Sequence, residues 1–149
     1  MKAIYLALTL FFLSQQALGD FTVDGTFAGC DYGKVYLLTN GRFLLCESYG
    51  YQYAYRPDVY QLSSGRVLVD GEEYRGRIVD GSVISTNIDG EWEGCNFDSH
   101  RLANGMILYC NSYFYEYAYM PSVEVILING EVSQISINGE VKDGVSVGR

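Results

Sequence analysis

Basic residues are scarce in this chain of 149 residues. Ten lysines and arginines stand against 18 aspartates and glutamates, and the formal net charge is −8. The basic residues are scattered along the sequence, whereas proteins that bind nucleic acid usually carry a basic patch or stripe. The composition therefore argues against a nucleic-acid partner. Acidity by itself favours solubility rather than a particular activity.

Histidine occurs once, as His100, in the sequence Asp98-Ser99-His100. A nucleophile beside a base is a known catalytic arrangement, but adjacent residues of a strand point to opposite faces. A metal site is also not expected, because only one imidazole is present and no two cysteines are close in sequence. The sequence thus predicts no catalytic residues, no metal site and no cofactor.

Long apolar runs are confined to the amino-terminal end. Met1-Lys2 is followed by an apolar run to Leu13 and by the small-x-small sequence Ala17-Leu18-Gly19. The run is far shorter than the roughly 18–20 residues that span a bilayer. This pattern predicts a secretory signal peptide, cleaved after Gly19, and a periplasmic or secreted protein. Cleavage removes only Lys2 among charged residues, so the mature chain carries −9, and no later segment is apolar enough to span a membrane.

Most of the remaining chain is a sequence that occurs twice. The segment 49–57 recurs as 113–121, and Asp-Gly-x-aromatic-x-Gly-Cys at 24–30 recurs at 89–95. We therefore divide the chain into a signal peptide (1–19), an N-terminal unit (20–80) and a C-terminal unit (81–149). Gly81-Ser82 is the only candidate hinge and no linker separates the units, so we expect them to pack on each other.

Neither unit shows the periodicity of a helix, and β-branched and aromatic residues dominate. Asn-Gly or Asp-Gly at 40–41, 70–71, 104–105 and 138–139 predicts type I′ hairpin turns, because both central residues need positive φ. We expect about five strands per unit. In the N-terminal unit they lie near 25–30, 34–39, 42–48, 52–62 and 66–78, and in the C-terminal unit near 90–95, 99–103, 106–112, 116–128 and 132–147.

The predicted fold is all-β, with two tandem small five-stranded antiparallel barrels of SH3-like or OB-like type. A single ten-stranded sandwich or barrel is the alternative. Cysteine occurs twice in each unit, and in an exported chain this predicts disulfides. The duplication favours the pairing that closes each unit on itself, Cys30–Cys46 and Cys95–Cys110.

Each unit also places four tyrosines at every second position. They are Tyr49, Tyr51, Tyr53 and Tyr55, and Tyr113, Tyr115, Tyr117 and Tyr119. One interpretation is an exposed binding surface, because tyrosine rings can stack on sugars or hold an extended peptide. The other is the wall of a barrel, since the alternation continues past Pro57 and Pro121 into Val59 and Val123. If the register holds through the bend, the tyrosine face is the apolar face, which favours the wall.

Acidic residues supply a second class of function, a carboxylate-dependent hydrolase. The candidates mostly flank glycine turns and are Asp70, Glu72, Glu73, Asp89, Glu91 and Glu93. A third possibility is a purely structural envelope protein without a saturable ligand. The N-terminal unit has nine acids and six bases (net −3), and the C-terminal unit nine and three (net −6). Any ligand site can therefore lie on one unit or between them.

The combination of the Gly-Cys motif, Asn-Gly followed by cysteine, and Tyr-x-Tyr-Ala-Tyr-x-Pro resembles small exported bacterial proteins known mainly as hypothetical open reading frames. The likeness covers both units and implies localisation in the bacterial envelope, but it implies no activity and no site residues. We therefore expect a non-catalytic, disulfide-stabilised binding module whose partner is a peptide, a glycan or an envelope protein.

Overall fold

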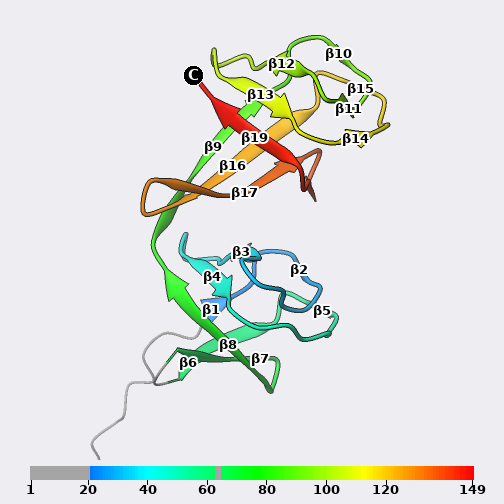
Figure 1. The fold of residues 1–149 in the computed structure, drawn as a ribbon. Helices are drawn as coiled ribbons and strands as arrows, with labels where there is room; N and C mark the ends of the chain where they lie inside the picture. The colour runs from blue at the N-terminus through cyan, green and yellow to red at the C-terminus, as the bar shows by residue number, and fades with distance from the viewer. Residues whose placement is uncertain (1–20, 63–64) are drawn as a thin grey trace, which may run out of the picture.

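The computed structural model describes residues 21–62 and 65–149, and every regular element in these ranges is a β-strand (Figure 1). The all-β prediction is confirmed. The predicted signal peptide, with its cleavage site after Gly19, lies outside the described residues. Within them, no helix is long and apolar enough to cross a membrane.

The N-terminal unit contains eight short strands. They are β1 (Phe21–Thr22), β2 (Thr26–Phe27), β3 (Val35–Leu37), β4 (Phe43–Cys46), β5 (Ala54–Tyr55), β6 (Asp58–Leu62), β7 (Arg66–Val69) and β8 (Glu72–Val79). Six of them form one antiparallel sheet in the order β1-β6-β7-β8-β4-β3, and β2 pairs with β5. An isolated bridge between Val23 and Leu38 brings the two edges of this sheet together, so the sheet curls strongly.

The C-terminal unit contains the remaining strands. They are β9 (Gly81–Asn87), β10 (Glu91–Trp92), β11 (Cys95–Asn96), β12 (Ser99–Arg101), β13 (Ile107–Cys110), β14 (Tyr113–Phe114), β15 (Ala118–Tyr119), β16 (Ser122–Ile128), β17 (Glu131–Ile137), β18 (Glu140–Val141) and β19 (Val145–Gly148). The order β18-β17-β16-β9 and the order β12-β13-β19 together correspond to the six-stranded sheet of the first unit. The ladder is divided because residues 142–144 interrupt the chain between β18 and β19.

The strand expected at 66–78 is in fact two strands, β7 and β8. Asp70 and Gly71 both have positive φ (47° and 83°) and reverse the chain between them, as a type I′ turn requires. Asn138-Gly139 does the same between β17 and β18. The two tandem five-stranded barrels therefore stay a prediction. All ladders among the described strands run within one unit.

The Asn-Gly pairs at 40–41 and 104–105 form hairpins of another type than expected. Only the glycine has positive φ there, and the asparagine side chain accepts a hydrogen bond from the backbone N–H two residues later, Arg42 (3.0 Å) or Met106 (3.1 Å). Asparagine thus stabilises these turns through its side chain rather than by adopting a left-handed backbone.

Each unit has its own core, crossed by the predicted disulfide. Cys30–Cys46 joins the core around Phe27, and Cys95–Cys110 joins the core around Trp92. All four cysteines are buried. The predicted pairing is confirmed, and disulfides of this kind indicate folding in an oxidising compartment.

A third apolar cluster forms between the units. Val35 and Phe43 of the first unit pack with Ile126 of the second. Beside it, the side-chain amide of Gln134 acts like a neighbouring strand: its Oε1 accepts the Val35 N–H (3.1 Å) and its Nε2 donates to the Val35 carbonyl (3.3 Å). The expectation that the units pack on each other agrees with these contacts.

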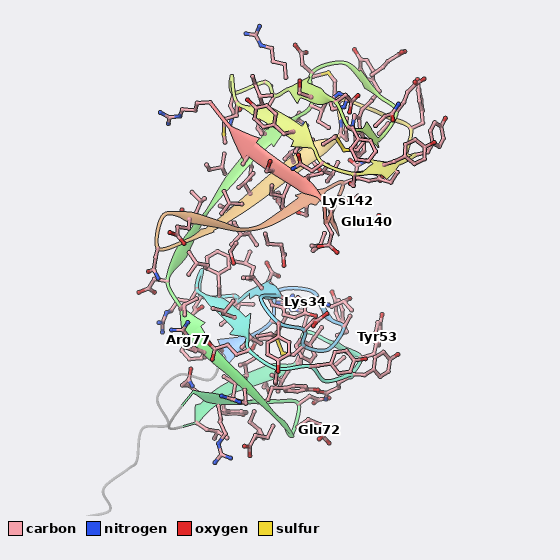
Figure 2. All side chains as sticks on the ribbon, viewed as in Figure 1. Lys34, Tyr53, Glu72, Arg77, Glu140 and Lys142 are labelled. Atoms are coloured by element: carbon pink, nitrogen blue, oxygen red, sulfur yellow. A yellow bond between two sulfur atoms is a disulfide. The ribbon has the colours of Figure 1, made fainter. Side chains whose placement is uncertain are left out.

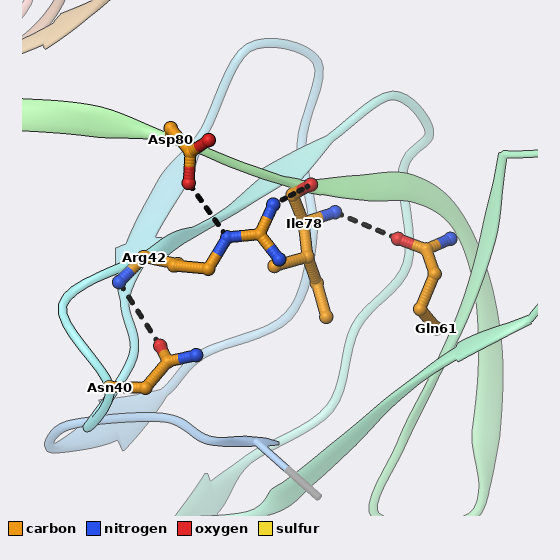
Figure 3. A network of polar contacts seen from close by, with 5 residues as sticks. All are labelled: Asn40, Arg42, Gln61, Ile78 and Asp80. Carbon is orange, nitrogen blue, oxygen red and sulfur yellow. Dashed lines mark hydrogen bonds and ion pairs between the residues drawn. The ribbon is translucent and has the colours of Figure 1, made fainter. Parts of the chain in front are cut away.

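The connection between the units is a single residue, Asp80, which separates β8 from β9. Arg42 bonds its carboxylate (Nε to Oδ1, 2.9 Å) and reaches the Ile78 carbonyl (3.3 Å) (Figure 3). On the other side of this strand, Gln61 accepts the Ile78 N–H (2.8 Å). Gly81, the expected hinge, begins β9, and a Cβ on it would lie 2.5 Å from the Leu127 carbonyl oxygen. The connection is therefore held directly between two strands and does not form an open hinge.

We predict that removing either disulfide costs a similar amount of stability. The sequence separations are 16 and 15 residues, and a loop of this length contributes about 3 kcal/mol in the chain-entropy model. The double variants C30A/C46A and C95A/C110A should each lower the free energy of unfolding in urea by about this amount. A loss below about 1 kcal/mol in either variant would contradict a structural role for that bridge.

Candidate functional site

The eight tyrosines of the two segments are all exposed to solvent. Their exposed fractions run from 60% for Tyr117 to 83% for Tyr51. Their description as a barrel wall, favoured by the alternation, is therefore wrong. The segments 49–55 and 113–119 lie on the same side of their units, at the right in Figure 1, and Tyr53 points away from the ribbon (Figure 2).

The alternation gives the wrong prediction because one residue in each unit has a backbone conformation that changes the direction in which the following side chains point. Arg56 and Met120 have positive φ (49° and 47°), an uncommon backbone conformation for residues other than glycine. Pro57 and Pro121 follow them and are buried, although they share the alternation of the exposed tyrosines. The assumption that register holds through the bend therefore fails at a single backbone angle.

The tyrosine segment of the first unit is pinned to the Gly29-Cys30 turn. Cys30 and Gly50 exchange backbone hydrogen bonds in both directions (2.8 and 2.9 Å). Gly29 has a φ of +80°, and a Cβ on it would lie 2.3 Å from the Gly50 carbonyl oxygen. Only glycine allows this approach, which explains the Gly-Cys pair of the repeated motif.

The second unit repeats the arrangement. Cys95 pairs with Phe114 across β11 and β14. Gly94 has a φ of +90°, and a Cβ there would lie 2.1 Å from the Phe114 carbonyl oxygen. Both tyrosine segments are thus held by backbone contact beside a disulfide, which leaves their odd-numbered side chains unused for packing.

The inward side of the first segment is tied to β8. The Tyr74 hydroxyl donates to Gln52 Oε1 (2.7 Å), and the Tyr74 ring occupies the space above Gly50, where a Cβ would lie 2.4 Å from ring atom Cε1. Burial, with a smaller effect of the Glu72 charge, raises the pKa of Tyr74 above its ordinary value.

The second unit makes the same link with different residues. Phe114 replaces Gly50, and Lys142 lies over its ring with Nζ 5.2 Å from the ring centroid. Lys142 donates to Glu116, which stands where the first unit has Gln52, and to Glu140 (2.8 Å). Burial disfavours the charged amine, but these hydrogen bonds outweigh it and raise the pKa of Lys142.

Asp98 and His100, for which the sequence predicts no catalytic role, lie close together in the structure. His100 Nε2 lies 3.3 Å from Asp98 Oδ1, outside hydrogen-bonding geometry. A hydrogen bond from the Asn96 N–H (3.0 Å) outweighs partial burial and, with His100 nearby, lowers the pKa of Asp98. Cys110 Sγ lies close to both side chains, but it is bonded to Cys95 and cannot serve as a thiolate ligand.

A pocket with a volume of about 580 Å³ opens on the second unit. Sequence reasoning did not find it, because it gathers residues from β10, from β11 and β12, and from the start of the tyrosine segment. Its lining residues are Glu91, Glu93, Gly94, Cys95, Asn96, Asp98, His100, Tyr113 and Tyr115. The tyrosine segment and the acidic β10 thus form one surface.

A second hollow, of about 360 Å³, lies between the units. Its lining residues are Tyr32, Gly33, Lys34, Val132, Ser133, Gln134, Ile135, Val141, Lys142, Asp143, Gly144 and Val145. Lys142 and Glu140 point from the second unit toward the first, on which Lys34 lies (Figure 2). Asp143 is the single acid in this lining, so the cleft does not bring together the two facing carboxylates that a carboxylate-dependent glycoside hydrolase uses.

The six acids proposed from the sequence for a hydrolase are dispersed. Asp70, Glu72 and Glu73 lie at the β7–β8 turn of the first unit, and Asp89 lies just before β10 of the second. Of these six acids, Glu91 and Glu93 line the pocket on the second unit. No family model matches this chain, and the comparisons with curated proteins and with solved structures also give no match.

We predict that Gly29→Ala destabilises the protein much more than Gly33→Ala. Both glycines have nearly the same φ (+80° and +79°), but a Cβ at residue 33 meets no atom within 4 Å. The backbone clash at residue 29 should cost about 2 kcal/mol more in urea unfolding. Gly94→Ala and Gly105→Ala form the same matched pair in the second unit. Equal losses within a pair would show that the close approach is not needed.

We also predict that Lys142 and Glu116 are energetically coupled. Their side chains are only 13% and 25% exposed, so Lys142→Met leaves a partly buried carboxylate without its cation. This variant should lose about 1–2 kcal/mol, and adding Glu116→Gln should restore most of it. Chemical denaturation of the wild type, both single variants and the double variant gives the coupling free energy. Strict additivity would contradict the link between the segment and β18–β19.

Proposed function

We propose that this chain is a non-catalytic binding module of the bacterial envelope, exported through its amino-terminal signal sequence. The observation that carries the proposal is the exposure of all eight segment tyrosines on a backbone fixed by glycine contacts and disulfides. Eight exposed aromatic side chains within two short segments go beyond the singly scattered apolar residues that are normal on a protein surface, and large exposed apolar patches mark interaction sites.

The chemistry of tyrosine suits this role. Its ring offers a large contact area, its hydroxyl can donate and accept hydrogen bonds, and only two side-chain torsions are fixed on binding. The segments are held in place before any ligand arrives, which reduces the entropy lost on association. The ligand class is a peptide, a glycan or an envelope protein presenting an extended surface.

Three further features support an exported binding module. The disulfides agree with an oxidising compartment. The resemblance to small exported bacterial proteins points to the envelope. The two units present their tyrosine segments on one side of the molecule. Two barrel-like units, each closed by its own disulfide, would then form a rigid carrier for the tyrosines.

The test is the loss of ligand binding when the tyrosines are replaced. Two variants, Y51S/Y53S/Y55S and Y115S/Y117S/Y119S, should remain as stable as the wild type within about 0.5 kcal/mol, because the side chains are exposed. Glycan and extended-peptide arrays should give saturable binding to the wild type that one or both variants lose. Tyr32→Ser is the control for losing an exposed tyrosine elsewhere, since Tyr32 is 75% exposed and lies outside both segments.

Two outcomes would overturn the proposal. If no array component binds saturably, the alternative of a purely structural envelope protein is favoured. If the triple variants bind as well as the Tyr32→Ser control, the tyrosines are not the ligand surface. Binding that survives in these variants but is followed by cleavage of the probe would favour the hydrolase alternative.

A further inference from the structure

The pocket on the second unit combines carboxylates with aromatic rings. Glu91, Glu93 and Asp98 line it together with Tyr113 and Tyr115. Glu91 and Glu93 form no ion pair within the described residues, and the only cationic neighbour of Asp98 is His100, when protonated. The pocket therefore carries negative charge that the chain itself does not neutralise.

The corresponding surface of the first unit has different charges. Glu91 pairs with Tyr119 as Thr26 pairs with Tyr55, so Thr26 and Ala28 occupy the positions of Glu91 and Glu93. The Asp98 carbonyl accepts the Cys110 N–H as the Lys34 carbonyl accepts the Cys46 N–H, so Lys34 occupies the position of Asp98. Three acids of one unit thus replace two uncharged residues and a lysine of the other.

The three acids beside tyrosine rings favour an organic cation as the ligand of this pocket. Carboxylates attract cations, and the faces of tyrosine rings attract organic cations in particular. Guanidinium and ammonium groups satisfy both, since they donate hydrogen bonds to carboxylates and stack on aromatic rings. A volume of about 580 Å³ lies in the range of ordinary ligand pockets and exceeds what a bare metal ion needs.

We propose that this pocket binds an arginine or lysine side chain of a partner polypeptide. The proposal rests on the proposed binding function and specifies the chemical class of the ligand that the second unit binds. The polypeptide source is favoured because Tyr117 and Tyr119 continue the exposed surface beyond the pocket and offer contact area to residues that flank the basic side chain. The net charge of −6 on this unit also attracts a basic partner.

The test uses short blocked peptides and the purified, disulfide-intact protein. The probes are acetyl-Gly-Arg-Gly-amide, its lysine analogue and its citrulline analogue, which is nearly isosteric with arginine but uncharged. Backbone amide shifts of residues 91–100 and 113–115 report the pocket. Fluorescence reports it as well, because Trp92 is the only tryptophan and its ring centroid lies 6.4 Å from that of His100. We expect saturable shifts with both basic peptides and about tenfold weaker binding of the citrulline peptide.

A charge-matched pair of variants separates the pocket from the overall charge. E91Q/E93Q should weaken binding of the arginine peptide about tenfold. E124Q/E131Q removes the same charge from exposed positions of β16 and β17 outside this lining, and it should leave the affinity nearly unchanged. Both variants should keep the amide spectrum of a folded protein, because the replaced side chains are exposed.

Several results would overturn the proposal. Equal affinity for the citrulline and arginine peptides, or no binding by either basic peptide, would exclude a cation site. Equal effects of E91Q/E93Q and E124Q/E131Q would reduce it to general electrostatics. The same shifts with calcium chloride at lower concentration would indicate an inorganic ion, and tighter binding of spermidine would indicate a free polyamine. In each case, array binding that depends on the segment tyrosines would leave the proposed function standing.

Discussion

The close backbone contact between the Gly-Cys turn and the tyrosine segment is the constraint on which the candidate surface depends. Gly29 and Gly94 allow the chain to approach within a distance that any Cβ would prevent. The backbone hydrogen bonds of Cys30 and Cys95 then fix the segment, and the disulfides fix the cysteines. Because backbone atoms hold the segment, the tyrosine side chains are not needed to stabilise it. They remain free to contact a ligand.

The two units use different residues to fill the space behind their tyrosine segments. Behind the first segment, a tyrosine from β8 fills the space left by Gly50 and bonds Gln52. Behind the second, Phe114 fills the space itself, and Lys142 bonds Glu116 across its ring. A neutral hydrogen bond in one unit corresponds to an ion pair in the other, with the same tyrosines exposed in front. The inner residues therefore vary as a set, which is expected when they share one cavity.

Part of the fold could be predicted from local chemistry. The all-β class, the Asp70-Gly71 and Asn138-Gly139 turns and both disulfides follow from residue type, spacing and the repeated sequence, whereas the number of strands and the type of the Asn40-Gly41 and Asn104-Gly105 turns do not. The exposure of the tyrosines could not be predicted, because it depends on the left-handed backbone of Arg56 and Met120, residue types that do not signal such a conformation. The acidic pocket could also not be predicted from the sequence, since Glu91, Asp98 and Tyr113 become neighbours only through the pairing of distant strands.

The single-residue connection between β8 and β9 has a consequence for any ligand with more than one epitope. Asp80 is bonded by Arg42, and the units share an apolar cluster, so these contacts restrict how far the two tyrosine segments can move relative to each other. A polymer that engages one segment then meets the other at a high effective concentration, but only when its own repeat matches the separation of the two segments. Polymers with other repeats gain nothing from the second segment. Two similar units joined by a single residue would thereby turn two weak contacts into a preference for polymers of one repeat length.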